Sequence, residues 1–129
     1  AHSLMSNNYV AYPQTAKVGE VLAALRRSGQ EPEPISYIYV LDDNVPEEKL
    51  LVGVVDLREL ILAADDLPLS EIMSAPVVGA EADDALDDVA EMFAKYHFRL
   101  LPVVDEHDHI LGVIFYSDIM KGLVTHAKV

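Results

Sequence analysis

Phe98-Arg99-Leu100-Leu101-Pro102-Val103-Val104-Asp105 opens the stretch of sequence that decides the fold. A charged tip at residues 106–109 separates it from a second apolar run, Ile110-Leu111-Gly112-Val113-Ile114-Phe115. Two apolar, β-branched runs on either side of a short polar tip predict a β-hairpin. Ser117 and Asp118 follow, and both residue types cap helices. The stretch therefore predicts strand, hairpin, strand and helix start, with polar groups at a junction where ligands often meet helix N–H groups.

The same pattern occurs earlier in the chain, between Ser36 and Leu60. Val40-Leu41-Asp42 corresponds to Val103-Val104-Asp105, and Gly53 corresponds to Gly112. Further upstream, Ser3-Leu4-Met5-Ser6 is repeated as Glu71-Ile72-Met73-Ser74. The chain is therefore an internal duplication.

An amphipathic helix is expected before each hairpin. The apolar residues of both helices follow the i, i+3, i+4, i+7 spacing of one buried stripe. They are Val18, Val21, Leu22 and Leu25 in the first copy and Leu86, Val89, Ala90 and Phe93 in the second. Thr15 is expected to cap the first helix, and Asp83 or Asp84 the second.

Two copies of strand, helix, strand, strand, helix predict a mixed α/β (α+β) fold. A copy of about 60 residues is too small to bury its sheet alone, so we expect the copies to pack sheet to sheet with pseudo-twofold symmetry.

The chain is strongly acidic, with a formal net charge of −13. Between Glu59 and Phe93 there is no Lys or Arg, whereas the acids are Glu59, Asp65, Asp66, Glu71, Glu81, Asp83, Asp84, Asp87, Asp88 and Glu91. Nucleic acid and anionic membranes need clustered basic residues, so this charge argues against both and favours a cation. The alternative is a solvated face that keeps the protein soluble.

Several other classes of protein are disfavoured. The longest apolar run, Leu50 to Val55, is far shorter than the roughly 20 residues of a membrane helix, so we expect no insertion by this piece. Absence of cysteine excludes disulfides and thiolate metal sites. The nucleotide-loop, zinc-protease and hydrolase motifs are also missing, so we expect no enzymatic activity. His107 and His109 on the hairpin tip are a tempting metal pair, but exposed, solvated side chains are the favoured interpretation.

The duplicated β-α-β-β-α order, the Ile-Met-Ser opening at Ile72, the Leu-Pro-Val-Val-Asp strand and the acid six residues after Gly112 together resemble a tandem CBS domain pair. Tyr37-Ile38-Tyr39-Val40, Leu57-Arg58-Glu59-Leu60 and Phe98 to Asp105 resemble, more narrowly, the regulatory pair of MgtE-type magnesium transporters.

The resemblance implies a first CBS repeat at residues 5–64, a linker at 65–70 and a second repeat at 71–125. Residues 1–4 would be a disordered remnant of cloning, and 126–129 a tail. It further implies a Mg²⁺-sensing gating module at the cytoplasmic face of the cell membrane. Such a module would form a homodimer and work beside an N-terminal helical domain and a transmembrane domain of the same parent chain.

The ion-contacting positions of the transporter family fall on Asp87, the carbonyl of Ala94, His97 and Asp118. Asp87 and Asp118 keep the acidic pattern. His97 departs from it, as does Lys121, where another acid is expected, and a histidine suits a hard cation poorly. The alternatives are a solvated carboxylate for Asp87 and a helix cap for Asp118.

A second implied ligand is an adenine nucleotide, ATP or AMP. In the family pattern the ribose contact falls on Glu59, six residues after Gly53, and the positions that wall the adenine fall on Tyr37, Val78, Phe98 and Leu101. Arg58 is placed for a phosphate, because a guanidinium suits that group. The hydroxyl that many CBS pairs place three residues after the strand glycine is absent, since Asp56 and Phe115 stand there. Core packing is the alternative for the apolar members.

Two other functions therefore remain beside magnesium sensing. One is an adenine-nucleotide-sensing CBS pair regulating another transporter, channel or enzyme. The other is a structural dimerisation module without a ligand.

Overall fold

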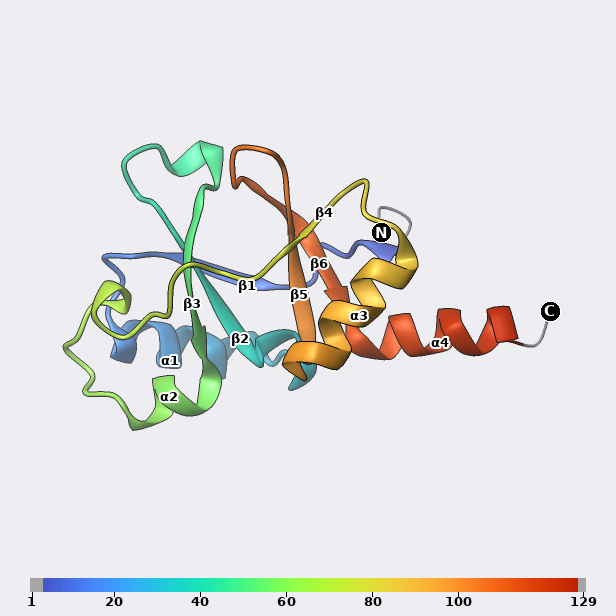
Figure 1. Ribbon diagram of the computed structural model, residues 1–129. Coiled ribbons are helices and arrows are strands. Elements are labelled where there is room, and N and C mark those ends of the chain that lie inside the picture. Colours follow the sequence, from blue (N-terminus) through green and yellow to red (C-terminus); the bar gives the residue numbers. More distant parts are fainter. Residues whose placement is uncertain (1–3, 128–129) are drawn as a thin grey trace. The chain divides into compact units, whose positions relative to one another are not determined.

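The computed structural model describes residues 4–127, with side chains described as far as Lys121. The chain forms two compact units. The first unit comprises Tyr9–Val77, and the second combines residues 4–8 with the chain from Val78 onward. Each unit contains the element order β-α-β-β-α, which confirms the predicted mixed α/β fold (Figure 1).

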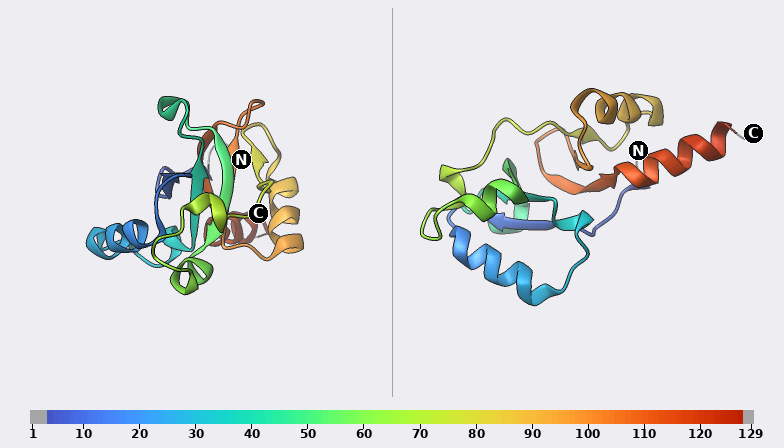
Figure 2. Two further views of the ribbon diagram at one scale, coloured as in Figure 1. Left: turned by 90° about the vertical axis from the view of Figure 1, so that its left-hand side faces the viewer. Right: turned by 90° about the horizontal axis from the view of Figure 1, so that it is seen from below.

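The first unit is built on a three-stranded sheet in the order β1-β2-β3. β1 (Val10–Pro13) runs parallel to β2 (Tyr37–Leu41), which pairs antiparallel with β3 (Leu51–Asp56). The helices are α1 (Val18–Ser28) and α2 (Leu57–Leu62), and α1 lies along the sheet (Figure 2). Short 3-10 turns η2 (Glu33–Ile35), η3 (Pro46–Glu48) and η4 (Leu69–Glu71) fill the connections.

The second unit repeats this plan with the sheet order β4-β5-β6. β4 (Ala80–Glu81) runs parallel to β5 (Leu100–Val104), and β5 pairs antiparallel with β6 (Ile110–Phe115). The helices are α3 (Leu86–Tyr96) and α4 (Tyr116–Ala127). None of the helices within residues 4–127 combines the length and the apolar character needed to cross a bilayer.

Each unit has its own hydrophobic core, and the predicted helical stripes face these cores. In the first unit Val18, Val21 and Leu25 are buried, with Leu22 packed at the margin. In the second unit Val89 and Phe93 are buried, with Leu86 and Ala90 at the margin. The 3.6-residue period thus identified the buried face of both helices.

The predicted helix caps are wrong. α1 begins at Val18 and not after Thr15, whose hydroxyl instead donates to Asp43 Oδ2 at 2.7 Å. Ala85 occupies the cap position of α3 without a side-chain bond, while Asp84 accepts from the backbone N–H of Glu81 at 2.9 Å.

The cap predicted for α4 is wrong as well. This helix begins at Tyr116, so Ser117 and Asp118 lie in its first turn and not before it.

Backbone carbonyls of the linker satisfy the N-terminal amides of α1. Val18 N–H donates to Leu67 O at 2.9 Å and Gly19 N–H to Asp65 O at 3.0 Å. In return, Leu69 N–H donates to Ala16 O at 2.9 Å. The first N–H groups of a helix lack intrahelical partners, so this neighbouring chain replaces the expected side-chain cap.

A short segment ahead of each repeat pairs with the return strand of the other repeat. Ser74 exchanges two backbone hydrogen bonds with Val54 of β3, at 2.8 and 3.1 Å. Ser6 does the same with Val113 of β6, at 2.8 and 2.9 Å. We call residues 4–6 and 72–74 the head segments. Each head segment therefore adds a backbone pairing to a sheet whose own strands come from the other copy.

Glycine is required where the head segments cross the return strands. A Cβ on Gly53 would stand 2.8 Å from Met73 Cγ and would also collide with Met73 Sδ. A Cβ on Gly112 would stand 2.5 Å from Met5 Cγ and 2.8 Å from the carbonyl oxygen of Ser6. The methionine side chains therefore occupy the space that a strand side chain would fill.

We expect Gly112→Ala to lower the free energy of unfolding by about 3 kcal/mol and Gly53→Ala by somewhat less, because overpacking costs about 1–3 kcal/mol. Met73→Ala should recover much of the Gly53→Ala loss. Met5→Ala should recover less of the Gly112→Ala loss, because the Ser6 carbonyl still obstructs the new methyl group.

Denaturant unfolding of the single and double variants gives these coupling energies. Gly29→Ala is the control: its φ is +63° but nothing lies within 4 Å of its added Cβ, so only about 1 kcal/mol of backbone strain is expected. Equal losses at Gly29 and Gly112 would contradict the steric explanation.

Candidate functional site

In the first unit the strand-to-helix junction is organised by Asp56. Its carboxylate caps α2 by accepting the backbone N–H of Arg58 at 2.8 Å. The Arg58 guanidinium folds back onto the same carboxylate, with Nη2 3.0 Å from Oδ2 and Nε 3.2 Å from Oδ1. Hydrogen bonding and attraction by Asp56 raise the pKa of Arg58. The Asp56 carboxylate, which would repel a phosphate group, is therefore paired with the Arg58 guanidinium, which would attract a phosphate group.

Three of the predicted nucleotide residues belong to this junction. Tyr37 begins β2 and is the direct partner of Asp56 on β3, so both side chains are on the same face of the sheet. Tyr37 is half-buried, whereas Arg58 and Glu59 are exposed in the first turn of α2. The Arg58 side chain is 88% exposed, so it remains accessible to a ligand despite its bond to Asp56.

The other three predicted nucleotide residues lie in the second unit and serve its core. Leu101 is fully buried in the hydrophobic cluster, and Val78 and Phe98 pack against it. The Phe98 ring stacks on Tyr96 with centroids 5.5 Å apart and planes 11° apart. Packing thus accounts for Leu101 completely, while Val78 and Phe98 are only half-buried.

The four predicted ion-contacting residues all lie in the second unit. Asp87 is exposed in the first turn of α3, Ala94 is in the last turn, and His97 follows the helix with a left-handed φ of 57°. Asp118 is half-buried in the first turn of α4. Asp87 and His97 are ten positions apart, which on a rise of 1.5 Å per residue is about 15 Å. Asp87 and His97 are therefore too far apart to bind one shared ion.

A cluster of three carboxylate side chains, which was not predicted from the sequence, precedes α3. Glu81, Asp83 and Asp84 each offer an oxygen, and these atoms lie within 4.8 Å of one another. Glu81 and Asp83 are exposed and Asp84 is half-buried. From the sequence these acids were part of a longer acidic stretch, and Asp83 or Asp84 was a candidate helix cap, but the three were not recognised as one cluster. A Glu-x-Asp-Asp run directly before a helix was the available signal, because the turn there brings the side chains together.

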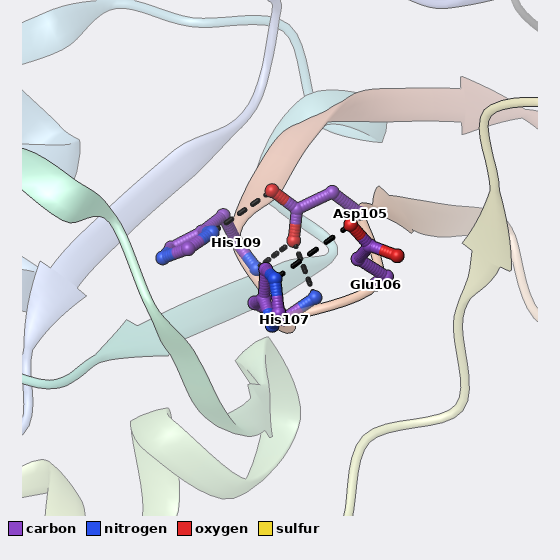
Figure 3. Close-up of polar contacts among 4 residues, drawn as sticks. All are labelled: Asp105, Glu106, His107 and His109. Atoms are coloured by element: carbon purple, nitrogen blue, oxygen red, sulfur yellow. Dashed lines mark hydrogen bonds and ion pairs between the residues drawn. The ribbon is translucent and has the colours of Figure 1, made fainter.

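The hairpin tip between β5 and β6 is held by Asp105 (Figure 3). Its Oδ1 accepts the backbone N–H groups of His107 and His109, both at 2.9 Å, and its Oδ2 lies 2.8 Å from His109 Nδ1. The His107 side chain is exposed, as expected, but that of His109 is only 29% exposed. The histidines therefore contribute to the turn, and Asp42 performs a similar task in the first hairpin by accepting the N–H of Asn44 at 2.9 Å.

These features together define a tandem pair of sheet-and-helix modules with acidic strand-to-helix junctions. A family model for the CBS domain matches residues 1–66 and 69–125. The chain belongs to the CBS domain family and contains two copies of that domain.

Among known proteins, the chain is similar to the magnesium transporter MgtE of Thermus thermophilus. The two are 39% identical over 127 residues, which are 98% of this chain and 27% of the transporter. The chain thus spans about a quarter of the length of this curated relative.

Solved structures also show similarity to magnesium transporters. The soluble part of a magnesium transporter matches with a TM-score of 0.87 and 31% identity, over 97% of this chain and 47% of that one. The cytosolic domain of the Mg²⁺ channel MgtE in complex with ATP matches with a TM-score of 0.83 and 39% identity, over 92% of this chain and 46% of that one. The resemblance to the cytosolic region of MgtE, seen in the sequence, is confirmed.

The Asp105 turn should make stability depend on acidic pH. The backbone hydrogen bond from His109, together with those from its ring and from His107, lowers the pKa of Asp105 from 3.8 to about 2. The unfolded chain therefore takes up this proton first, and the stabilisation is present above about pH 4 and lost as the pH falls towards 2.

Asp105→Asn should consequently be less stable than the parent at pH 7, with the difference shrinking between pH 4 and pH 2. Chemical denaturation at several pH values measures this difference. Asp108→Asn is the matched control, because Asp108 is exposed on the same tip at φ 67°, a conformation that asparagine adopts readily. A pH-independent difference for Asp105→Asn would rule out the linkage.

Proposed function

We propose that this CBS pair is the Mg²⁺-sensing regulatory region of an MgtE-type magnesium transporter, lying at the cytoplasmic face of the cell membrane. The observation that carries the proposal is the 39% identity to MgtE, which extends over 98% of the chain. In this proposal the partners are a helical N-terminal domain and a transmembrane domain of the same parent chain, and the pair regulates transport without catalysing a reaction.

Electrostatics supports a divalent cation as the signal. The chain carries a net charge of −13, and the carboxylates of Glu81, Asp83 and Asp84 crowd within 4.8 Å ahead of α3. Two carboxylates about 4 Å apart repel by roughly 4 kcal/mol at an effective dielectric of 20, an upper value for exposed groups. Mg²⁺ retains most of its water and binds through one or two carboxylates, which suits exposed acids such as Asp87.

The gating step follows from the same charges. Ions bound at Asp87 and Asp118 cancel repulsion between acidic surfaces, so occupancy favours a compact assembly and a closed pore. Loss of the ions lets the acids separate and opens the pore. The Ala94 carbonyl, at the negative end of α3, and the His97 side chain mark a further position that binds a hard cation more weakly.

Homodimerisation through the CBS pair is part of the proposal. Apolar side chains are exposed on the last helix of each repeat, with Ile61 58% and Leu62 86% exposed on α2, and Tyr116 44% and Met120 40% exposed on α4. Ile61 and Met120 occupy equivalent positions in the two copies. Exposed apolar groups at matching positions suit a symmetric interface between two chains.

The magnesium proposal predicts that MgCl₂ raises the melting temperature beyond NaCl at matched ionic strength. A ligand that binds only the folded state stabilises it by about 2.7 kcal/mol at 100 times its Kd. The double variant Asp87→Asn and Asp118→Asn should lose most of the Mg²⁺-specific shift. Thermal unfolding of the chain and of the intact parent transporter, with sedimentation to follow the dimer, provides the measurement.

Glu31→Gln is the control variant, since it removes one exposed carboxylate outside the acidic stretch. It should keep the full Mg²⁺ response. Absence of a Mg²⁺-specific shift in the parent transporter, or an unaltered shift in the Asp87 and Asp118 double variant, would refute the proposal.

An adenine nucleotide is the second candidate ligand, supported by the exposed guanidinium of Arg58 beside Tyr37. The cytosolic domain of MgtE, 39% identical to this chain, is described in complex with ATP. In this proposal Arg58 contacts phosphate, Glu59 accepts from the ribose, and Tyr37, Val78 and Phe98 contact the adenine. Leu101 is buried in the core cluster against which Val78 and Phe98 pack.

Arg58→Ala should weaken ATP binding at least tenfold, about 1.4 kcal/mol, while leaving the fold intact. The fold survives because Asp56 caps α2 through the backbone N–H of residue 58, which the substitution retains. Calorimetric titration with ATP and with AMP measures the effect. Arg26→Ala, at the exposed end of α1, is the matched control and should bind as the parent does. Equal ATP affinities of the Arg58→Ala and Arg26→Ala variants would contradict a phosphate contact by Arg58.

A further inference from the structure

The two methionines of the head segments occupy equivalent and unusual positions. Met73 lies on Gly53 of β3, and Met5 lies on Gly112 of β6. Each methionine is so close to its strand that a Cβ at the glycine position would collide with it. Both are half-buried and pack against a hydrophobic core, Met73 in the first unit and Met5 in the second. Each thioether thus has an apolar surface on one side and retains some exposure on the other.

The backbone beside each methionine forms a pairing of only two hydrogen bonds. Ser74 is joined to Val54 and Ser6 to Val113 by reciprocal N–H to carbonyl bonds of 2.8–3.1 Å. An isolated bridge of this kind has no long ladder to hold it in register. Its position therefore depends on the side-chain packing immediately next to it, which is the contact between methionine and glycine.

We propose that Met5 and Met73 are modification sites, at which oxidation by a hydroperoxide releases the head segments from the return strands. The peroxide O–O bond breaks and one oxygen atom is transferred to Sδ, forming a sulfoxide. The thioether loses two electrons, and hydrogen peroxide is reduced to water. Sulfoxide reductases reverse this chemistry, so the step is a reversible switch.

The chemical change acts at the point of closest approach. A sulfoxide oxygen is a strong hydrogen-bond acceptor, and it is joined to a sulfur that rests on a glycine Cα and an apolar core. Burying that oxygen without a donor costs free energy, so the oxidised side chain turns towards water. When the side chain leaves the glycine, the two-bond pairing beside it loses its support.

The remaining methionines provide an internal comparison. Met92, on α3, is half-buried against the second core but does not approach a strand glycine. Met120, on α4, is 40% exposed. Met120 should be oxidised first, because oxidation rate follows exposure, yet its oxidation should not affect either head segment.

The test compares two double variants treated with hydrogen peroxide. Met5→Leu with Met73→Leu removes the proposed sites and keeps the volume, whereas Met92→Leu with Met120→Leu removes the others. Mass spectrometry of peptides locates each added oxygen. Thermal unfolding and amide exchange at Ser6 and Ser74 report the consequence, and methionine sulfoxide reductases specific for each epimer are then added to test reversal.

Oxidation should lower the melting temperature of the parent chain and of the Met92 and Met120 double variant by about 5 °C or more. Amide exchange at Ser6 and Ser74 should accelerate at least tenfold, and the reductases should restore both properties. In the Met5 and Met73 double variant Met120 should still be oxidised, but neither the melting temperature nor amide exchange at Ser6 and Ser74 should change appreciably. An equal loss of stability in that variant, or oxidation at residues 5 and 73 without faster exchange at Ser6 and Ser74, would overturn the proposal.

If the double variant at Met5 and Met73 proves unstable before treatment, the single variant Met73→Leu still decides the question. It should protect the Ser74 amide from the effect of peroxide and leave the Ser6 amide sensitive. Parallel acceleration at both amides would then contradict the proposal.

Discussion

The absence of a side chain at Gly53 and Gly112 is the constraint on which both units depend. Each glycine lets a methionine from the other copy lie directly on a return strand, where a Cβ would come within 3 Å of it. This approach allows the Ser74–Val54 and Ser6–Val113 pairings to form. Backbone hydrogen bonds also fix the linker, because its carbonyls accept the N–H groups at the start of α1. Short chain segments that seem to be connections thus complete the sheets and helices.

The acidic residues divide into two groups with different tasks. Asp42, Asp56, Asp84 and Asp105 accept hydrogen bonds from nearby backbone N–H groups and thereby shape turns and helix starts. Others, such as Asp87 and Glu81, are exposed on or near α3. The first group is therefore engaged in the fold, whereas the carboxylates of the second group face solvent. Net charge alone does not make this distinction, whereas the hydrogen bonds do.

Local patterns predicted the secondary structure, because periodicity and hairpin signals act over a few residues. The stripes at Val18 and Leu86 and both hairpins are where the sequence indicated. The predicted helix caps were wrong, because they depend on contacts between residues far apart in the sequence. Thr15 donates to Asp43 of the first hairpin, and carbonyls of residues 65 and 67 cap α1. The pairing of Asp56 with Arg58 and the proximity of Glu81, Asp83 and Asp84 also escaped prediction, because both depend on how the backbone turns.

The exchange of head segments has an evolutionary consequence. Each repeat completes its sheet with residues that precede the other repeat, so in one repeat alone the outer edge of the return strand, at Val54 or Val113, lacks a partner. An ancestral gene encoding a single repeat would have met this need by joining two identical polypeptides, each lending its leading residues to its twin. In the duplicated chain the exchange takes place within one polypeptide, so the two head segments need not have the same sequence.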